Sequence, residues 1–249
     1  MGLLGKKTGI IFTFAGEIGI IMKESGVLNM NEFRTIELKK GIYERNNVIA
    51  QETREDLTKK NTSLLNLMSS PGAGKTTFIV ETIKALRDEM SIAVMEADVD
   101  SDVDAATIAQ TGTKVIQLHT GGMCHLDAEM TRQGLESLDA QNVDMIVLEN
   151  IGNLLCTAGY DTGAHINVMI LSVPEGDDKP LKYPPMFRAA DVLIISKVDA
   201  LTIFDFNMDA CISRAKSLNP NIEIFPVSAK TGEGMNLWLT WLRRNVGHK

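Results

Sequence analysis

The sequence predicts an α/β fold with a mostly parallel central sheet that is flanked by helices on both faces. Seven short apolar runs are typical of buried strands, at residues 64–68, 92–95, 115–118, 145–148, 168–173, 192–195 and 222–227. Between and after these runs, apolar residues recur at helical spacing, at residues 76–90, 124–138, 208–218 and 234–246. Strands that alternate with helices indicate βαβ units, in which helices cover both faces of a parallel sheet.

The composition is that of a soluble globular protein. Of the 249 residues, 44% are hydrophobic and 23% are charged, and the formal net charge is −7. A negative surface disfavours nucleic-acid binding, which depends on clustered lysine and arginine. The 3 cysteines cannot all pair within one chain, and a domain of this size needs no disulfides, so we expect a reducing, cytoplasmic location.

The first 60 residues carry weaker signals. An apolar stretch within residues 1–26 is interrupted by Glu17, which argues against a secretion signal and against a membrane span. Residues 31–61 are polar and charged, with apolar residues spaced for one amphipathic helix. We expect residues 1–60 to form an N-terminal extension and a lead-in helix.

A phosphate-binding loop follows the first apolar run of the predicted sheet. Residues 69–76 read Ser-Ser-Pro-Gly-Ala-Gly-Lys-Thr, which is a Walker A loop with Ser69 at its usual first glycine. Its backbone N–H groups can face the phosphates, and the start of the next helix adds a positive dipole end. Residues 61–249 are therefore expected to form a P-loop NTPase domain. The residues expected to bind the nucleotide here are Pro71, Gly72, Ala73, Gly74, Lys75, Thr76 and Thr77.

Acidic residues at the ends of two other strands are candidates for magnesium binding. Asp98 and Glu149 each follow an apolar run, and with the Thr76 hydroxyl they could supply oxygen ligands to Mg²⁺. Glu149 opens a segment with the layout of a switch loop, in which the Gly152 N–H could meet the γ-phosphate. The expected catalytic residues are Lys75, Thr76, Asp98 and Glu149. Asp100, Asp102 and Asp104 are interpreted as solvated or helix-capping residues.

Two later segments favour guanine over adenine. Residues 196–199, Ser-Lys-Val-Asp, resemble the Asn-Lys-x-Asp element of GTPases, with Ser196 in place of asparagine. The Asp199 carboxylate can accept hydrogen bonds from guanine N1 and N2, and the Lys197 stem can lie along the base. Ser228, Ala229 and Lys230 match the Ser-Ala-Lys loop that contacts the guanine carbonyl in many GTPases.

Two cysteines and a histidine form a candidate site for a transition metal. Cys124 and His125 follow the apolar run at 115–118, and Cys156 lies seven residues after Glu149. Thiolate and imidazole are suitable ligands for zinc or nickel. The spacing alone is a weak signal, since buried structural cysteines are common. Cys211, inside a helical pattern, is expected only to pack.

The combined motifs resemble those of HypB-type hydrogenase nickel-incorporation GTPases. The resemblance covers residues 46–246 and is carried by residues 69–77, 124–128, 149–156 and 175–178. It implies a GTPase that cycles between GTP and GDP with Mg²⁺, and binding of Ni²⁺ or Zn²⁺ by Cys124, His125 and Cys156 at a dimer interface. It also implies a homodimer, a zinc-containing accessory partner and delivery of nickel to the hydrogenase large-subunit precursor.

The residues leave other functions open. The GTPase could serve a different metalloenzyme, of the urease type or one that uses cobalamin. The chain could also be a non-catalytic metal carrier that binds nucleotide only as a structural ligand, or an ATP-dependent kinase. No glutamine is available near the switch segment to orient the attacking water.

Overall fold

The structure is a computed structural model that describes residues 10–14, 17–21, 40–98 and 102–246. The chain divides into two compact units, Met1–Leu38 and Lys39–Lys249. Within the first unit, strands β1 (Ile10–Phe14) and β2 (Glu17–Ile21) pair antiparallel. None of the described helices is both long enough and apolar enough to cross a bilayer.

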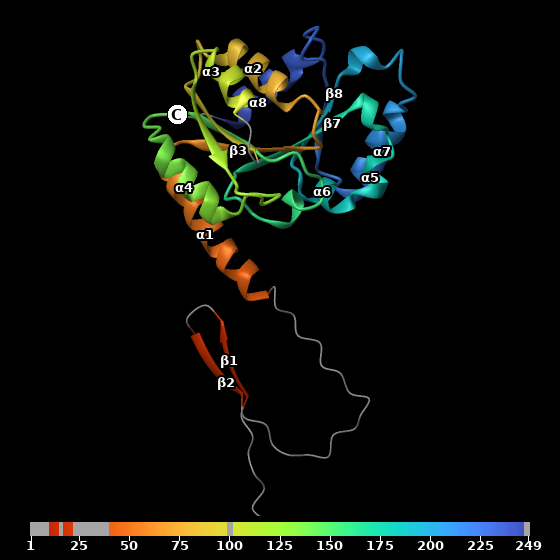
Figure 1. Cartoon of the computed structure of the whole chain (residues 1–249). Coiled ribbons are helices and arrows are strands. Elements are labelled where there is room, and N and C mark those ends of the chain that lie inside the picture. The colour runs from red at the N-terminus through yellow and green to blue at the C-terminus, as the bar shows by residue number, and fades with distance from the viewer. Residues whose placement is uncertain (1–9, 15–16, 22–39, 99–101, 247–249) are drawn as a thin grey trace, which may run out of the picture. The chain divides into compact units, whose positions relative to one another are not determined.

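The second unit is built on a seven-stranded sheet in the order β5-β4-β6-β3-β7-β8-β9 (Figure 1). All neighbouring strands in it are parallel, so the predicted fold class is confirmed. Each of the seven predicted strands is present, with every end within three residues of its predicted position. Their bounds are β3 Ser63–Ser69, β4 Ile92–Asp98, β5 Lys114–His119, β6 Met145–Glu149, β7 Ile166–Ser172, β8 Val192–Ser196 and β9 Glu223–Pro226.

Helices cover both faces of this sheet (Figure 1). One face packs against α2 (Lys75–Leu86), α3 (Val103–Ala109) and α8 (Met235–Asn245). The other face packs against α1 (Lys40–Lys59) and α4 (Ala128–Leu138), and farther along against α6 (Pro184–Ala189) and α7 (Met208–Leu218). The short helix α5 (Lys179–Lys182) and the 3₁₀ turns η1 (Thr157–Gly159), η2 (Val173–Glu175) and η3 (Val198–Ala200) complete the unit.

Helices α4 and α2 are shorter than expected. Helix α4 begins at Ala128 rather than at residue 124, because Asp127 is extended and its side chain accepts a hydrogen bond from the Met130 N–H at 2.8 Å. Residues 124–127 therefore lie in a loop. Helix α2 ends at Leu86 rather than at residue 90. The predicted lead-in helix at 31–61 is present over Lys40–Lys59, and its predicted start at residues 31–39 lies outside the described residues.

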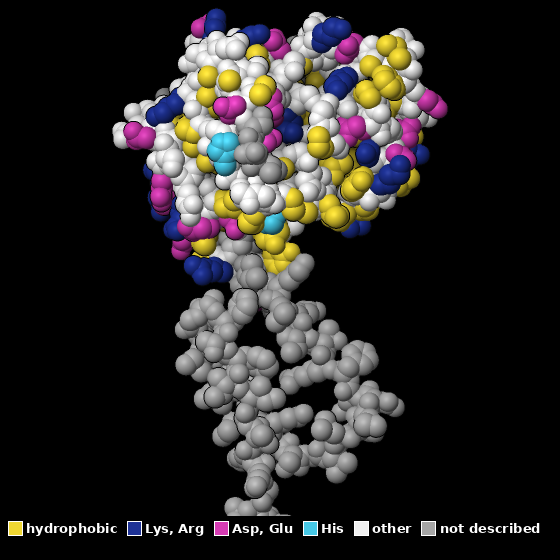
Figure 2. All heavy atoms as spheres, in the orientation of Figure 1, with side chains coloured by type: hydrophobic (Ala, Val, Ile, Leu, Met, Phe, Trp, Pro, Cys, Tyr) yellow, Lys and Arg dark blue, Asp and Glu magenta, His cyan; other side chains and the backbone are white. Residues whose placement is uncertain are grey.

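On the face of the larger unit that Figure 2 shows, acidic, basic and hydrophobic side chains are interspersed. Among the described residues of that face, lysine and arginine do not gather into one continuous patch. This distribution agrees with the negative net charge of the sequence.

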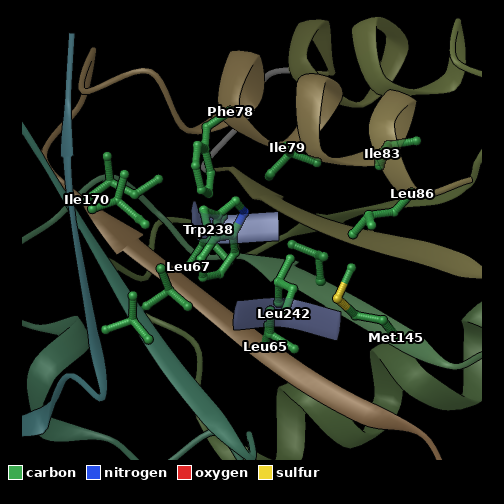
Figure 3. Packing of buried hydrophobic residues seen from close by; sticks show 14 of the residues in the cluster. Leu65, Leu67, Phe78, Ile79, Ile83, Leu86, Met145, Ile170, Trp238 and Leu242 are labelled. Atoms are coloured by element: carbon green, nitrogen blue, oxygen red, sulfur yellow. The ribbon is translucent and has the colours of Figure 1, made fainter. Parts of the chain in front are cut away.

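The core between α2, α8 and the sheet centres on Trp238. Its side chain is buried, with its ring 5.3 Å from that of Phe78, and its indole N–H donates to the Thr82 hydroxyl at 3.1 Å. In Figure 3 it lies between Phe78 of α2 and Leu67 of β3. Helix α8, close to the end of the chain, thus supports the helix and strand that flank the phosphate-binding loop.

We expect Trp238→Ala to destabilise the protein by about 3–5 kcal/mol, because it removes a large buried ring and leaves a cavity. Leu237, the neighbouring residue on α8, is 61% exposed, and Leu237→Ala should change stability by less than about 0.5 kcal/mol. Chemical denaturation of both variants measures the difference. Equal effects would contradict the central position of Trp238.

Candidate nucleotide and metal site

The phosphate-binding loop joins the centre of the sheet to α2. Gly72 and Gly74 have φ angles of 75° and 95°, in the left-handed region that glycine tolerates, so the loop can curl back over the end of β3. The Lys75 ammonium donates to the Ser69 hydroxyl at 3.1 Å. Ser69, which replaces the usual glycine, therefore holds the lysine at the end of β3.

Thr76 and Glu149 come together as the sequence predicts. The Thr76 hydroxyl donates to Glu149 Oε1 at 3.0 Å, and the second carboxylate oxygen of Glu149 has no hydrogen-bond partner among the described residues. A hydroxyl and a carboxylate oxygen next to a phosphate-binding loop form a donor set that suits Mg²⁺. Glu149 is 1% exposed, so its position is set by the packing around β6.

Two acidic residues that were not among the expected magnesium ligands lie beside Glu149. The carboxylates of Glu96, Asp104 and Glu149 offer oxygens within 4.8 Å of one another. Asp98 is the last residue of β4, two residues after Glu96, and pairs with His119 of β5. Asp104 was interpreted as a solvated or capping residue, and it does lie half-buried in the first turn of α3, but it also faces Glu149; Glu96 was missed. The signal for Glu96 was present, since it precedes Asp98 by two residues and so points to the same face of β4.

Burial dominates the electrostatics of this acidic group. It raises the pKa of Glu96 to about 8, and the charge of Glu149 adds to the increase. Burial likewise raises the pKa of Glu149 to about 7, while the Lys75 ammonium opposes that increase. Both carboxyl groups are thus ready to give up a proton when a cation is bound near them.

A pocket of about 350 Å³ lies at the ends of β8 and β9. Its lining includes the predicted residues Ala73, Gly74, Thr77, Lys197, Asp199, Ser228, Ala229 and Lys230. The Ser228 hydroxyl donates to Asp199 Oδ1 at 2.7 Å, which orients the carboxylate expected to read guanine. The structure therefore brings together the predicted base-binding segments and the phosphate-binding loop.

Two contacts tie the base-binding loop to the phosphate-binding loop. The Ser196 hydroxyl donates to the Ala73 carbonyl at 2.8 Å, and the Lys197 ammonium donates to the Gly72 carbonyl at 2.6 Å. Ser196 thus forms a loop-holding hydrogen bond despite its short side chain. Lys197 has a φ of 60°, an unusual backbone conformation for a residue other than glycine, and the bond from its side chain helps to hold it.

The predicted metal ligands lie in two neighbouring loops. Cys124 Sγ is 3.9 Å from His125 Nδ1, and a hydrogen bond with Cys156 raises the pKa of the Cys124 thiol. The two thiols are therefore adjacent, although their residues are far apart in the sequence. Among the described residues, Cys124, His125 and Cys156 do not form a group whose ligand atoms all lie within 4.8 Å of one another.

An aromatic contact that the sequence analysis missed holds His125. The imidazole stacks on the Tyr160 ring with centroids 3.8 Å apart and planes 15° apart, and burial lowers the pKa of His125. Tyr43 of α1 in turn contacts the Tyr160 ring, with ring centroids 5.2 Å apart. Asn46 of α1 accepts from the Ala128 N–H and donates to the Asp161 carbonyl, each at 2.8 Å. Helix α1 thus braces the histidine loop.

The segment from Glu149 to Cys156 connects the nucleotide site with the thiols. Gly152 lies against the phosphate-binding loop so closely that an added Cβ would be 2.9 Å from the Pro71 backbone nitrogen. Farther on, the Asn153 side chain accepts from the N–H groups of Leu155 and Cys156, at 2.8 and 3.1 Å. The segment is therefore held at the P-loop and at the cysteine.

Two other predicted features have packing or bracing roles. Cys211 is fully buried within the core beneath α7, as predicted. Of the residues at 175–178, Glu175 caps a turn by accepting from the Ser172 N–H and hydroxyl, and Asp177 forms an ion pair with Arg214 at 2.7 Å. These acidic residues hold the loop after β7.

Comparisons with known proteins agree with this geometry. Residues 63–226 match the family described as "CobW/HypB/UreG, nucleotide-binding domain". The hydrogenase maturation factor HypB of Rhizobium leguminosarum bv. viciae is 45% identical over 223 residues, which are 90% of this chain and 75% of that protein. The crystal structure of HypB from Archaeoglobus fulgidus has a TM-score of 0.76 at 35% identity, covering 81% of this chain and 98% of that one. HypB from Helicobacter pylori, crystallised in complex with nickel, has a TM-score of 0.74 at 36% identity, covering 82% and 98%.

The raised pKa values of Glu96 and Glu149 predict that the contribution of these two groups to stability falls as the pH rises. Without nucleotide or metal, the folded protein keeps protons on these groups that the unfolded chain, with a pKa of 4.5, has released. Their contribution to the free energy of unfolding should therefore decrease between pH 4.5 and about 8, by at most about 1.4 kcal/mol per pH unit for each group.

Thermal unfolding in a chelator across this pH range measures the effect. Glu96→Gln cannot ionise and should flatten the curve, whereas Glu136→Gln on the exposed side of α4 should leave it unchanged. The same pH dependence of stability in the wild type and in Glu96→Gln would contradict the assignment.

Proposed function

Since the chain belongs to the CobW/HypB/UreG family, as a GTPase among its HypB hydrogenase maturation factors, we propose that it uses GTP hydrolysis to control the delivery of nickel during hydrogenase maturation. Nickel is the cargo in this proposal. The observation that carries it is the continuous segment from Glu149, beside Thr76, to Cys156, beside Cys124.

The phosphate-binding loop supports the hydrolytic part of the proposal. Its backbone N–H groups and the Lys75 ammonium neutralise the β- and γ-phosphates and stabilise the charge that develops as water attacks the γ-phosphorus. Mg²⁺, when bound, supplies further neutralisation of the same oxygens. Thr76 and Glu149 would hold it, because their oxygens meet in front of the loop and one Glu149 oxygen has no other partner among the described residues.

Guanine selection is attributed to the pocket at the ends of β8 and β9. Asp199 would accept hydrogen bonds from guanine N1 and N2, while Ser228 holds that carboxylate and Lys197 lies alongside the base. Adenine presents no such pair of donors. This difference between the two bases distinguishes a GTPase from an ATP-dependent kinase.

The segment 149–156 provides the link between nucleotide and cargo. A γ-phosphate and its cation would sit against Glu149 and next to Gly152, so the loss of phosphate changes the contacts at one end of the segment. Cys156 lies at the other end. Hydrolysis would therefore alter the position of one nickel ligand and weaken the hold on the metal.

A second copy of the chain fits the incomplete ligand set. Cys124 is exposed and Cys156 is half-buried, and the large hydrophobic side chains of Met123 and Leu155 next to them are 41% and 70% exposed. Two thiols and one imidazole from each copy could surround a shared metal. In this scheme the homodimer receives nickel with the help of a zinc-containing accessory protein and passes it to the hydrogenase large-subunit precursor.

The nucleotide specificity is tested by Asp199→Asn. An amide at this position can donate to the C2 carbonyl of xanthine but no longer accepts two hydrogen bonds from guanine, so preference should shift from GTP to XTP. Loss of GTP affinity by about a hundredfold is expected, and competition binding measures it. Lys75→Ala should abolish turnover of either nucleotide. A non-catalytic carrier would show no turnover even in the wild type.

The coupling between sites is tested with Gly152→Ala and Cys156→Ala. Nickel affinity of the wild type should differ between the GDP complex and the complex with a non-hydrolysable GTP analogue. Gly152→Ala pushes the segment away from Pro71 and should reduce this difference, whereas Cys156→Ala should weaken nickel binding in both states. Equal nickel affinity of the two wild-type complexes would sink the coupling proposal.

A further inference from the structure

A buried asparagine interrupts the central strand of the sheet. Asn66 of β3 is 1% exposed and stands between apolar residues of the same strand. Side chains alternate along a strand, so Asn66 faces the same side as Leu64 and Met68, which is the side opposite to α2. A parallel strand in the middle of a sheet is buried on both faces and is normally almost continuously apolar. An amide at this position therefore needs partners, because a buried polar group without a hydrogen bond is costly.

Asn66 has a partner on each side. The Asn150 side-chain nitrogen donates to Asn66 Oδ1 at 3.0 Å, and the Asn66 nitrogen in turn donates to Asn167 Oδ1 at 3.0 Å. Asn150 follows β6 and Asn167 lies on β7, the two strands that flank β3. Asn150 Oδ1 also accepts from the Ile151 N–H at 2.9 Å. Asn150, Asn66 and Asn167 thus form an amide chain in which each side-chain oxygen accepts a hydrogen bond.

The amide chain lies beside the start of the segment 149–156. Ile151 is buried in the apolar cluster that α1 and α4 cover, and Leu154 is buried in the cluster that α6 and α7 cover. The two neighbours of Asn66 on this face of β3 belong one to each of these clusters. The segment therefore runs from one cluster to the other across the face of β3 to which Asn66 points.

Amides at this crossing fix the position of the segment more narrowly than apolar side chains would. Apolar contacts are non-directional, so a segment held only by Ile151 and Leu154 could shift along the sheet. Asn150 keeps its bonds only where it lies now, because its side-chain nitrogen and oxygen both have partners within the protein. Two residues farther on, a Cβ added to Gly152 would be 2.9 Å from the Pro71 nitrogen. The amide chain therefore sets how closely Gly152 approaches the phosphate-binding loop.

We propose that Asn66 and Asn167 are positioning residues for GTP hydrolysis, which act through Asn150 to hold the Gly152 N–H where the γ-phosphate binds. They lie on the face of the sheet opposite to α2, so they influence the reaction through the turn at 150–152. The inference rests on the proposed function, in which this turn meets the γ-phosphate. GDP has no γ-phosphate, so the amide chain should affect turnover much more than GDP binding.

Two variants break the amide chain at different links. Asn66→Leu removes both bonds at nearly constant volume, and Asn167→Ala removes the acceptor of the Asn66 nitrogen at a half-buried position. In both, kcat for GTP should fall about tenfold while the Kd for GDP stays within about twofold of wild type. Asn167→Asp keeps an oxygen that can accept from Asn66 and should restore most of kcat. Asn221→Ala, in the exposed turn before β9, is the matched control and should change neither quantity.

Hydrogen exchange of the nucleotide-free full chain tests the positioning independently of turnover. The Ile151 N–H donates to Asn150, so peptides that cover residues 149–153 should exchange faster in the two variants that break the amide chain. Asn167→Asp should exchange at the wild-type rate. Exchange in α8, on the opposite face of the sheet, should stay unchanged in all variants, which distinguishes a loosened turn from a general loss of stability.

The inference is overturned by wild-type exchange at 149–153 in the variants, by an unchanged kcat, or by a loss of GDP affinity that parallels the loss of kcat. Asn167 is half-buried, so Asn167→Ala decides the matter even if Asn66→Leu fails to fold. An active wild type with unaffected variants would reject the inference alone. A wild type that hydrolyses no GTP would reject the proposed function and, with it, the inference.

Discussion

The hydrogen bond from Thr76 to Glu149 is the contact on which the rest of the site depends. It joins the first turn of α2, where the phosphates would bind, to the end of β6, where the segment leading to Cys156 begins. The two residues are neighbours because β6 lies beside β3 in the sheet although more than 70 residues separate them in the chain. Parallel pairing places both carboxyl ends at the same edge of the sheet, where open α/β sheets bind their ligands.

This arrangement buries two ionisable carboxyl groups, and the stability of the rest of the fold offsets their desolvation. Glu96 and Glu149 lie almost without solvent exposure, next to the apolar core between the sheet and α2. Carboxyl groups in such surroundings favour the neutral form until a cation offers compensation. The protein therefore contains a region whose charge depends on what is bound, directly beside the phosphate-binding loop. A large apolar core under α2 and α8, centred on Trp238, keeps this region in place (Figure 3).

The cargo loops are held by a different set of contacts. Asn46 and Tyr43 of α1 reach the start of α4 and the Tyr160 ring, and this ring stacks on His125. Cys156 is held instead through Asn153, within the segment that touches Pro71. One proposed metal ligand is thus fixed to the helical layer and another to the segment that is proposed to respond to the nucleotide. Relative movement of the two would open or close the ligand set.

The sequence by itself determined the parallel α/β fold, the phosphate-binding loop, the guanine-reading segments and the three metal-ligand candidates. These features are local, because apolar periodicity and short motifs record which residues face a core or a phosphate. Only the tertiary structure decided that Glu96 and Asp104 accompany Glu149, that Tyr160 stacks on His125, and that Gly152 lies against Pro71. Each of these contacts joins separate strands, helices or loops, and strand order and side-chain packing, which bring such segments together, leave no local pattern in the chain.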